Sequence, residues 1–517
     1  MTNNQWFKGV FLLTIAGFVS KILSASYRVP LQNMAGDEGI YIYQQIYPFI
    51  MIAWMLSIYG YPAALSKITN EHYNGTKKIV FPMKLLVMLC SVNILFFVLL
   101  FVGSDVLASG MGDPQLAASI RYTSFLFLLI PFTAFLRGGF QSASDMRPTA
   151  ISQTVEQFIR VICIVLFTYL LMDHGRSLYE VGKGAVLASI FGVAIGLIVL
   201  LIIAMKRRRD IIFSWQSVAR KSASKAFFVS AMVVSLNYFL LIFFQLVDNF
   251  TMIPGLIEGG FTYHDAKLEK GVYDRGQPIV QLGIVFGSSI ALALYPVSNR
   301  LKERLNREEI LSMKQVFKWN IIFSVAATIG LIFILPSLNI ALFQTALGNT
   351  ALSVFMLMVV FISLALTLST YLQGFGFIKR QMIVIGFVLV VKGFCNQWLI
   401  PEYGIVGAAV SSAVGGFILV IAFGWMLKKF VSVSLWKDFP FGSFLLSIAS
   451  MVCALLILRL SIPIAIDDRL SHFLFAMAAS VVGGIIFIVM MIVTKGFTKA
   501  EIELFPFGEK IVKRFRL

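Results

Sequence analysis

Apolar stretches of about 20 residues recur from one end of the chain to the other, and they limit the fold more than any other feature. The stretch 80–102 is typical, because it lacks the alternation of a membrane β-strand. Only helices and closed barrels satisfy every backbone polar group in lipid. Hydrophobic residues make up 58% of the 517 residues, and charged residues only 13%. The sequence therefore predicts an all-α polytopic membrane protein.

About fourteen transmembrane helices can be placed. They lie near residues 8–30, 40–66, 79–103, 117–140, 150–172, 182–205, 226–250, 277–298, 317–339, 351–374, 381–400, 404–427, 441–462 and 471–494. Roughly three quarters of the 43 Lys and Arg residues fall on the side of the membrane that holds the N-terminus, as expected of cytoplasmic segments. This bias and the even number of spans predict that both termini are cytoplasmic.

The net charge of +18 is carried mainly by short loops between spans. We therefore interpret it as contact with anionic membrane lipids and expect no nucleic acid partner. The sequence contains no GxSxG, HExxH or GxxxxGK[ST] motif. Its four cysteines lie in apolar segments without CxxC spacing, and its four histidines are scattered. We expect neither an enzyme nor a bound metal or cofactor.

A weak internal repeat suggests how the spans are grouped. Residues 184–189 (GAVLAS) resemble residues 407–412 (GAAVSS), and the two segments begin the sixth and twelfth spans. Ordinary packing of small residues between helices is the alternative explanation. The repeat favours two pseudo-symmetric six-helix lobes plus two C-terminal helices. The expected boundaries are 1–205 for the first lobe, 206–225 for a basic linker, 226–427 for the second lobe, 428–494 for the two extra helices and 495–517 for a basic cytoplasmic tail.

Charged residues inside two spans point to a polar chamber. Lys21 and Arg28 share a face of the first span, and the fifth span carries Glu156 and Arg160 with two glutamines on one face, Gln153 and Gln157. An ionisable group at bilayer depth costs on the order of 3 kcal/mol, so it is usually kept for a cavity or a partner. Arg28 could instead snorkel to the outer headgroups, and Glu156 and Arg160 could form a structural pair at i, i+4.

Two later spans add polar candidates for the same chamber. The seventh span carries Asn237, Gln245 and Asp248 on one face, although Asp248 could simply be interfacial. The eighth span begins with Gln277 and Gln281 around a proline that is ordinary at a helix start.

Five stretches resemble a known family. They are 36–48 (GDEGIYIYQQIYP), 60–67 (GYPAALSK), 137–141 (RGGFQ), 148–157 (PTAISQTVEQ) and 275–283 (RGQPIVQLG). In these stretches the chain resembles the bacterial polysaccharide-biosynthesis flippases, which include the stage V sporulation protein B type and the lipid II flippase type. The Ser-Arg…Arg pattern of that family's first span corresponds here to Ser20-Lys21…Arg28.

The resemblance implies a function in the bacterial cell membrane. It implies two six-helix lobes around a cationic cavity, with translocation of an undecaprenyl-pyrophosphate-linked saccharide from the inner to the outer leaflet by alternating access. The substrate would be a peptidoglycan precursor or a polysaccharide unit. Lys21, Arg28 and Arg160 would bind the pyrophosphate, while Glu156 and the glutamines would orient those cations or contact sugar hydroxyls. Cell-wall synthesis enzymes are candidate partners.

Two other functions remain open on the sequence alone. The first is a multidrug or cation antiporter of the same superfamily, which a net-basic stripe disfavours. The second is a non-transporting scaffold for cell-wall enzymes, in which the charges within the spans would be dispensable.

The orientation can be tested by labelling single cysteines in a cysteine-free variant. A cysteine at position 264 should react with an impermeant thiol reagent in intact cells, because the segment 251–276 is predicted to be external. A cysteine at position 208, in the basic linker, should react only after lysis. The reverse pattern would contradict the predicted topology.

Overall fold

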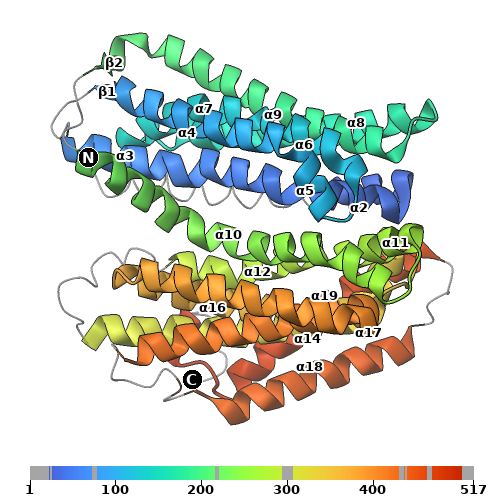
Figure 1. Ribbon diagram of the computed structural model, residues 1–517. Helices are drawn as coiled ribbons and strands as arrows, with labels where there is room; N and C mark the ends of the chain where they lie inside the picture. Colours follow the sequence, from blue (N-terminus) through green and yellow to red (C-terminus); the bar gives the residue numbers. More distant parts are fainter. Residues whose placement is uncertain are drawn as a thin grey trace. The chain divides into compact units, whose positions relative to one another are not determined.

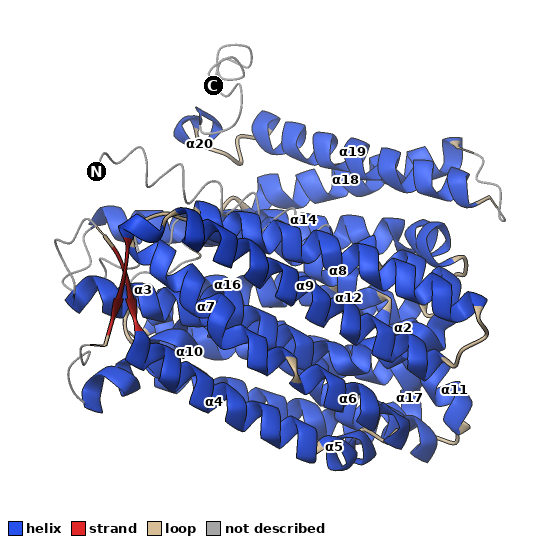
Figure 2. Cartoon of the chain, turned by 90° about the horizontal axis from the view of Figure 1, so that it is seen from above, coloured by secondary structure: helices blue, strands red, loops and turns tan. Residues whose placement is uncertain are grey.

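The computed structural model describes residues 23, 26–72, 78–215, 221–293, 307–429, 436, 439–462 and 468–503. These residues are almost entirely helical, as Figure 2 shows. Eleven helical segments are long and apolar enough to cross a membrane, judged by length and composition within the described residues. The prediction of an all-α polytopic membrane protein is confirmed.

The eleven segments are fewer than the fourteen expected spans partly because glycines reverse the chain inside two of them, and partly because the eighth expected span, 277–298, is not among them. Gly36 in α2 (Arg28–Met55) has φ 69° and ψ −171°. The Tyr27 and Tyr43 hydroxyls lie 2.7 Å apart, yet 16 residues of straight helix would separate them by about 24 Å. The chain therefore turns back at Gly36, without the intervening loop that the sequence analysis left between the first two spans.

The second reversal lies in α17 (Ile378–Lys428), at Gly404 with φ 58° and ψ −138°. Ser411 is hydrogen-bonded to Asn396, which 15 residues of straight helix would place about 22 Å away. This helix therefore contains both expected spans, 381–400 and 404–427. Most of the first expected span, 8–30, and the end of the eighth, 277–298, lie outside the described residues.

The chain forms two compact units, of which unit 1 comprises Met1–Pro278 and Ile385–Ser411. Figure 1 shows its helices running side by side. In addition to α2 and the 385–411 part of α17, it contains a π-helical turn (Leu56–Gly60), α3 (Tyr61–His72), β1 (Ile79–Pro82), α4 (Met83–Val102), α5 (Ser104–Gly110), a 3₁₀ turn (Pro114–Leu116), α6 (Ala117–Ser124), α7 (Leu126–Ser142), α8 (Arg147–Asp173), α9 (Leu178–Lys206), a second 3₁₀ turn (Arg208–Asp210), β2 (Ile211–Ser214), α10 (Lys221–Glu258) and α11 (Tyr263–Asp274).

Strands β1 and β2 pair in parallel, with Ile79 opposite Ile211. They are the only strands among the described residues. The adjoining Arg207 forms an ion pair of 2.5 Å with Asp145 in the turn between α7 and α8.

Unit 2 comprises Ile279–Val384 and Ser412–Leu517. It contains most of α12 (Gly276–Ala293), the remainder of α17, and α14 (Arg307–Phe343), α15 (Asn349–Phe355), α16 (Leu357–Gly374), α18 (Phe441–Ser461), α19 (Arg469–Val493) and α20 (Lys499–Glu503). Its core lies where α14, α18 and α19 meet, around buried residues such as Phe444, Met451 and Phe487. The last helix is fixed to α14, because Glu501 accepts hydrogen bonds from Lys318 and Trp319.

The segment between the seventh and eighth expected spans is largely helical. The segment 251–276 was predicted to be a long external loop, but α10 extends to Glu258 and α11 occupies most of the rest. The Thr262 side chain caps α11 by accepting from the Asp265 backbone N–H, which explains the extra helix. The lobe boundaries at 1–205, 206–225, 226–427, 428–494 and 495–517 stay a prediction.

The packing of α11 against the 36–39 turn of α2 can be tested at Gly271. A Cβ there would lie 2.1 Å from the carbonyl oxygen of Asp37. Gly271→Ala should therefore lower the melting temperature of the purified protein, at a cost of about 1–3 kcal/mol. The matched control is Gly330→Ala on α14, where a Cβ meets nothing within 4 Å. Equal melting temperatures for the two variants would contradict this packing.

Candidate functional site

The reversal at Gly36 places two buried arginines among three buried tyrosines of unit 1. The Arg160 guanidinium of α8 donates to the Tyr43 hydroxyl at 2.7 Å, and its Cζ lies 5.7 Å from the centre of the Tyr27 ring. The Arg28 Cζ lies 4.4 Å from the centre of the Tyr47 ring. All five side chains are at most 2% exposed. We call this group the arginine–tyrosine cluster.

Tyr43 connects the cluster. Its hydroxyl accepts from Arg160 and is hydrogen-bonded to Tyr27, and its ring lies edge-on to that of Tyr27 with centroids 5.6 Å apart. Tyr43 and Tyr47 share a helical face at i, i+4, so both rings reach the same region. The cluster therefore joins the start of α2, the part of α2 after the reversal, and α8.

The fifth-span carboxylate has a partner other than the one expected at i, i+4. Glu156 forms an ion pair of 2.7 Å with Arg137 of α7, not with Arg160. Arg137 also donates to Ser152 at 3.1 Å and to the Ser57 hydroxyl at 2.9 Å. Arg137 is therefore fully engaged and structural, whereas Arg160 has no carboxylate partner among the described residues.

Small residues let α9 pack closely over this part of α8. A Cβ at Gly192 would lie 2.8 Å from the Glu156 carbonyl oxygen, and one at Gly196 would lie 3.2 Å from the Glu156 Cβ. A cavity of about 10 Å³ remains, with Glu156, Arg160 and Ser189 in its lining. That volume holds about one water molecule. The cluster is closed in this conformation, so any larger ligand requires the helices to move.

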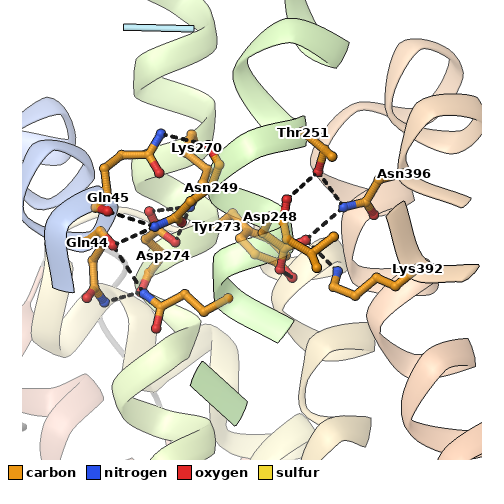
Figure 3. Close-up of polar contacts among 12 residues, drawn as sticks. Gln44, Gln45, Asp248, Asn249, Thr251, Lys270, Tyr273, Asp274, Lys392 and Asn396 are labelled. Carbon is orange, nitrogen blue, oxygen red and sulfur yellow. Dashed lines mark hydrogen bonds and ion pairs between the residues drawn. The ribbon is translucent and has the colours of Figure 1, made fainter. Parts of the chain in front are cut away.

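Asp248 of α10 belongs to a second buried network, shown in Figure 3. Its carboxylate pairs with the Lys392 ammonium at 2.5 Å and accepts from Asn396 at 3.0 Å. Tyr273 donates to the other carboxylate oxygen at 3.4 Å, and Asn396 also donates to Thr251 at 2.7 Å. Asp248 is 1% exposed, so the network is buried within the protein.

A proline explains how α2 joins this network. Pro48 has no N–H for the carbonyl of Gln44 four residues earlier. The side chains of Asn249 and Gln245 donate to that carbonyl instead, at 3.2 and 3.3 Å. Asn249 also donates to the carbonyl of Gln45, at 2.9 Å. Gln44 follows Tyr43 in the sequence, and Asn249 follows Asp248. The hydrogen bond between Gln44 and Asn249 therefore connects the arginine–tyrosine cluster to the second network.

A further ion pair lies within α11, where Lys270 contacts the Asp274 carboxylate at 2.6 Å. Burial raises the pKa of Asp274 to about 6, although Lys270 acts in the opposite direction. Tyr273 links this pair to Asp248 (Figure 3).

Helix α11 is also clamped to the turn at Gly36. The Arg275 guanidinium binds both carboxylate oxygens of Asp37, at 2.8 and 2.5 Å, and Lys267 binds Glu38 at 2.5 Å. These contacts fix the turn that joins the arm of α2 with Arg28 to the arm with Tyr43 and Tyr47.

The candidate residues from the sequence have different outcomes. Arg28 and Arg160 come together through the tyrosines, with Gln153 and Gln157 buried on the same helix as Arg160. Lys21 lies outside the described residues. Gln245 and Asp248 belong to the second network. Asn237 is partly buried on α10 and Gln277 is buried at the start of α12, while Gln281 belongs to unit 2. Neither network as defined includes these last three.

Sequence reasoning missed the tyrosines, Arg137 and Lys392 as site residues. Arg137 stands inside a stretch that carries the family resemblance, and Lys392 lies in the middle of an expected span, so both had a signal. Tyr43 and Tyr47 also stand in a resemblance stretch, 36–48, but nothing in that stretch indicates a cationic neighbour. Only the reversal at Gly36 gives them cationic neighbours.

Comparisons with known proteins agree with this architecture. Residues 6–302 match the family described as "Polysaccharide biosynthesis protein". The chain is 37% identical to the uncharacterized membrane protein YabM of Bacillus subtilis, over 98% of this chain and 96% of the relative. It is 24% identical to the lipid II flippase MurJ of the same organism, over 83% of each chain.

Two solved structures share the fold. A lipid II flippase MurJ in an inward closed conformation aligns with a TM-score of 0.66 at 16% identity, covering 93% of this chain and 98% of that one. An inward-facing multidrug resistance MATE family transporter aligns with a TM-score of 0.60 at 14% identity, covering 80% and 96%.

The Arg137–Glu156 pair makes a prediction about folding. Arg137→Gln should sharply reduce the amount of folded protein in the membrane, because an uncompensated buried carboxylate costs about 3–5 kcal/mol. Adding Glu156→Gln should restore the amount. Arg160→Gln is the control: it leaves the pair intact and should keep near wild-type abundance. A double variant as poor as Arg137→Gln alone would contradict the assignment.

Proposed function

The chain belongs to the polysaccharide biosynthesis protein family, and on that premise we propose that it translocates a lipid-linked saccharide across the cell membrane. The proposed ligand group is the pyrophosphate that joins a polyprenyl chain to the sugar. Transport would run from the inner to the outer leaflet by alternating access. The multi-pass fold shared with MurJ and MATE transporters supports a transporter of this kind.

The observation that carries the proposal is the pairing of two buried guanidiniums in one cluster. Arg28 and Arg160 both lie against Tyr27, with their charges removed from water. A guanidinium presents a planar fork of donors that suits phosphate oxygens. Arg160 has tyrosine partners and no carboxylate partner among the described residues, since Glu156 is paired with Arg137, so its charge is available to an anionic ligand. Lys21, seven residues before Arg28 in the sequence, would add a third cation.

The remaining polar residues suit the sugar. Gln153 and Gln157 are buried on α8 near Arg160, and the Gln157 amide has no hydrogen-bond partner among the described residues. Amide groups of this kind both donate to and accept from hydroxyls. The identity of the saccharide, a peptidoglycan precursor or another unit, and an association with cell-wall enzymes belong to this proposal as its finer parts.

A cation antiporter is the less favoured function. A site for cationic drugs needs uncompensated acidic residues, whereas Glu156 and Asp248 are each paired with a cation, by Arg137 and Lys392. A scaffold without transport would leave Arg28 and Arg160 with no reason to be buried.

The proposal predicts which variants lose transport. Arg28→Gln, Arg160→Gln and Lys21→Ala should each reduce flipping of a fluorescent lipid-pyrophosphate saccharide in proteoliposomes by at least about tenfold, which is 1.4 kcal/mol of lost ligand or transition-state binding. The matched control is Arg121→Gln. Arg121 belongs to the same unit but is exposed and paired with Asp105, so this variant should flip like wild type.

Membrane abundance is measured alongside for every variant. Full flipping activity of both Arg160→Gln and Arg28→Gln would overturn the assignment of the arginines as the pyrophosphate site. Absence of flipping by the wild type would overturn transport itself and favour the scaffold. Complementation of cells depleted of their lipid II flippase then tests lipid II as the substrate.

A further inference from the structure

Three tyrosines contact the two arginines of the proposed anion site. Tyr27 and Tyr43 are fully buried and Tyr47 is 1% exposed, so none of them serves as a surface residue. Between them they contact both guanidiniums. The closest ring contact, 4.4 Å from the Arg28 Cζ to the Tyr47 centroid, falls well within the range of a cation–π interaction.

The protein treats its buried arginines in two different ways. Arg137 has a carboxylate at 2.7 Å and two serine hydroxyls, which neutralise and fix it. Arg160 has one tyrosine hydroxyl at 2.7 Å and a tyrosine ring at 5.7 Å. Both arginines lie within reach of α8, so the difference is one of partner and not of depth.

The choice of partner has an energetic consequence. A buried carboxylate beside a guanidinium would compete with any anionic ligand, and breaking such a pair is costly. With no partner at all, the empty site would be unstable, because a buried charge needs compensation. Neutral tyrosines lie between these extremes, since a cation–π contact and a hydrogen bond to a charged group are each worth only a few kcal/mol at most.

We propose that Tyr27, Tyr43 and Tyr47 are affinity-setting residues that hold both guanidiniums while the site is empty and compete with the diphosphate group of the ligand for them. The inference rests on the proposed function. Binding of the ligand exchanges tyrosine contacts for phosphate contacts, and release restores them. The tyrosines thereby weaken binding enough for a multiply charged group to leave a buried cationic site.

The proposal predicts that removing a tyrosine partner tightens binding. In Tyr43→Phe the Arg160 guanidinium loses its hydroxyl acceptor in the empty state, so inorganic pyrophosphate should bind roughly tenfold more tightly. Tyr47→Leu, which removes the ring beside Arg28, should act in the same direction. In flipping assays both variants should show a lower KM together with a lower kcat, because release becomes slower. General damage to the fold would not increase affinity.

The experiment measures binding of inorganic pyrophosphate by calorimetry to the full-length protein in detergent. Tyr41→Phe is the control, because it also removes a buried tyrosine hydroxyl from α2. That hydroxyl donates to Asp113 at 2.9 Å and does not contact a guanidinium. Its affinity should equal that of wild type. Arg160→Gln should abolish binding.

The outcomes separate the two proposals. If Arg160→Gln loses binding but neither tyrosine variant binds more tightly than Tyr41→Phe, the inference about the tyrosines is wrong and the anion site stands. If pyrophosphate binds wild type and Arg160→Gln alike, or binds neither, the anion site itself is wrong. Should Tyr43→Phe fail to fold, Tyr47→Leu alone decides the matter.

Discussion

The carboxylate of Glu156 is the group on which the arrangement of the N-terminal helices depends. Its bond to Arg137 joins α7 to α8, and Arg137 extends the link to the π-helical turn at Ser57. At bilayer depth water cannot replace a missing partner, so this pairing fixes which faces of the helices meet. It also leaves Arg160, one turn further along α8, to the tyrosines. A single acidic residue thus gives Arg137 a carboxylate partner and leaves Arg160 with tyrosine partners.

The same constraint governs the second network. Asp248 and Lys392 come from segments 144 residues apart in sequence, and their 2.5 Å contact attaches the 385–411 part of α17 to α10. Each charge is acceptable in the membrane only because the other is present. Asn396 donates to the same Asp248 oxygen as Lys392 and also to the Thr251 hydroxyl, and Tyr273 donates to the other Asp248 oxygen. The two buried ion pairs thereby restrict which helices of this unit can be neighbours.

Much of the fold followed from the sequence, because hydropathy and length suffice to identify a helix in lipid. The face that joins Arg160 to its glutamines followed from helical periodicity. The partner of Glu156 did not follow from the sequence. Arg160, four residues later on the same helix, and Arg137 on another helix are equally good candidates until the packing is known. The tyrosines were equally hidden, because their role depends on a reversal that one glycine permits. Helix α11 was missed because its polar sequence resembles a loop.

The reversals at Gly36 and Gly404 occur with almost no chain between the spans that they join. Both are followed three residues later by another glycine, Gly39 and Gly407, where a side chain would collide with the preceding turn. A reversal this short leaves no slack, so each glycine decides which residues of the two arms face one another. Moving either reversal by one residue would change every contact between the arms that it joins. Two glycines that bind nothing thereby set the register of the helices around them.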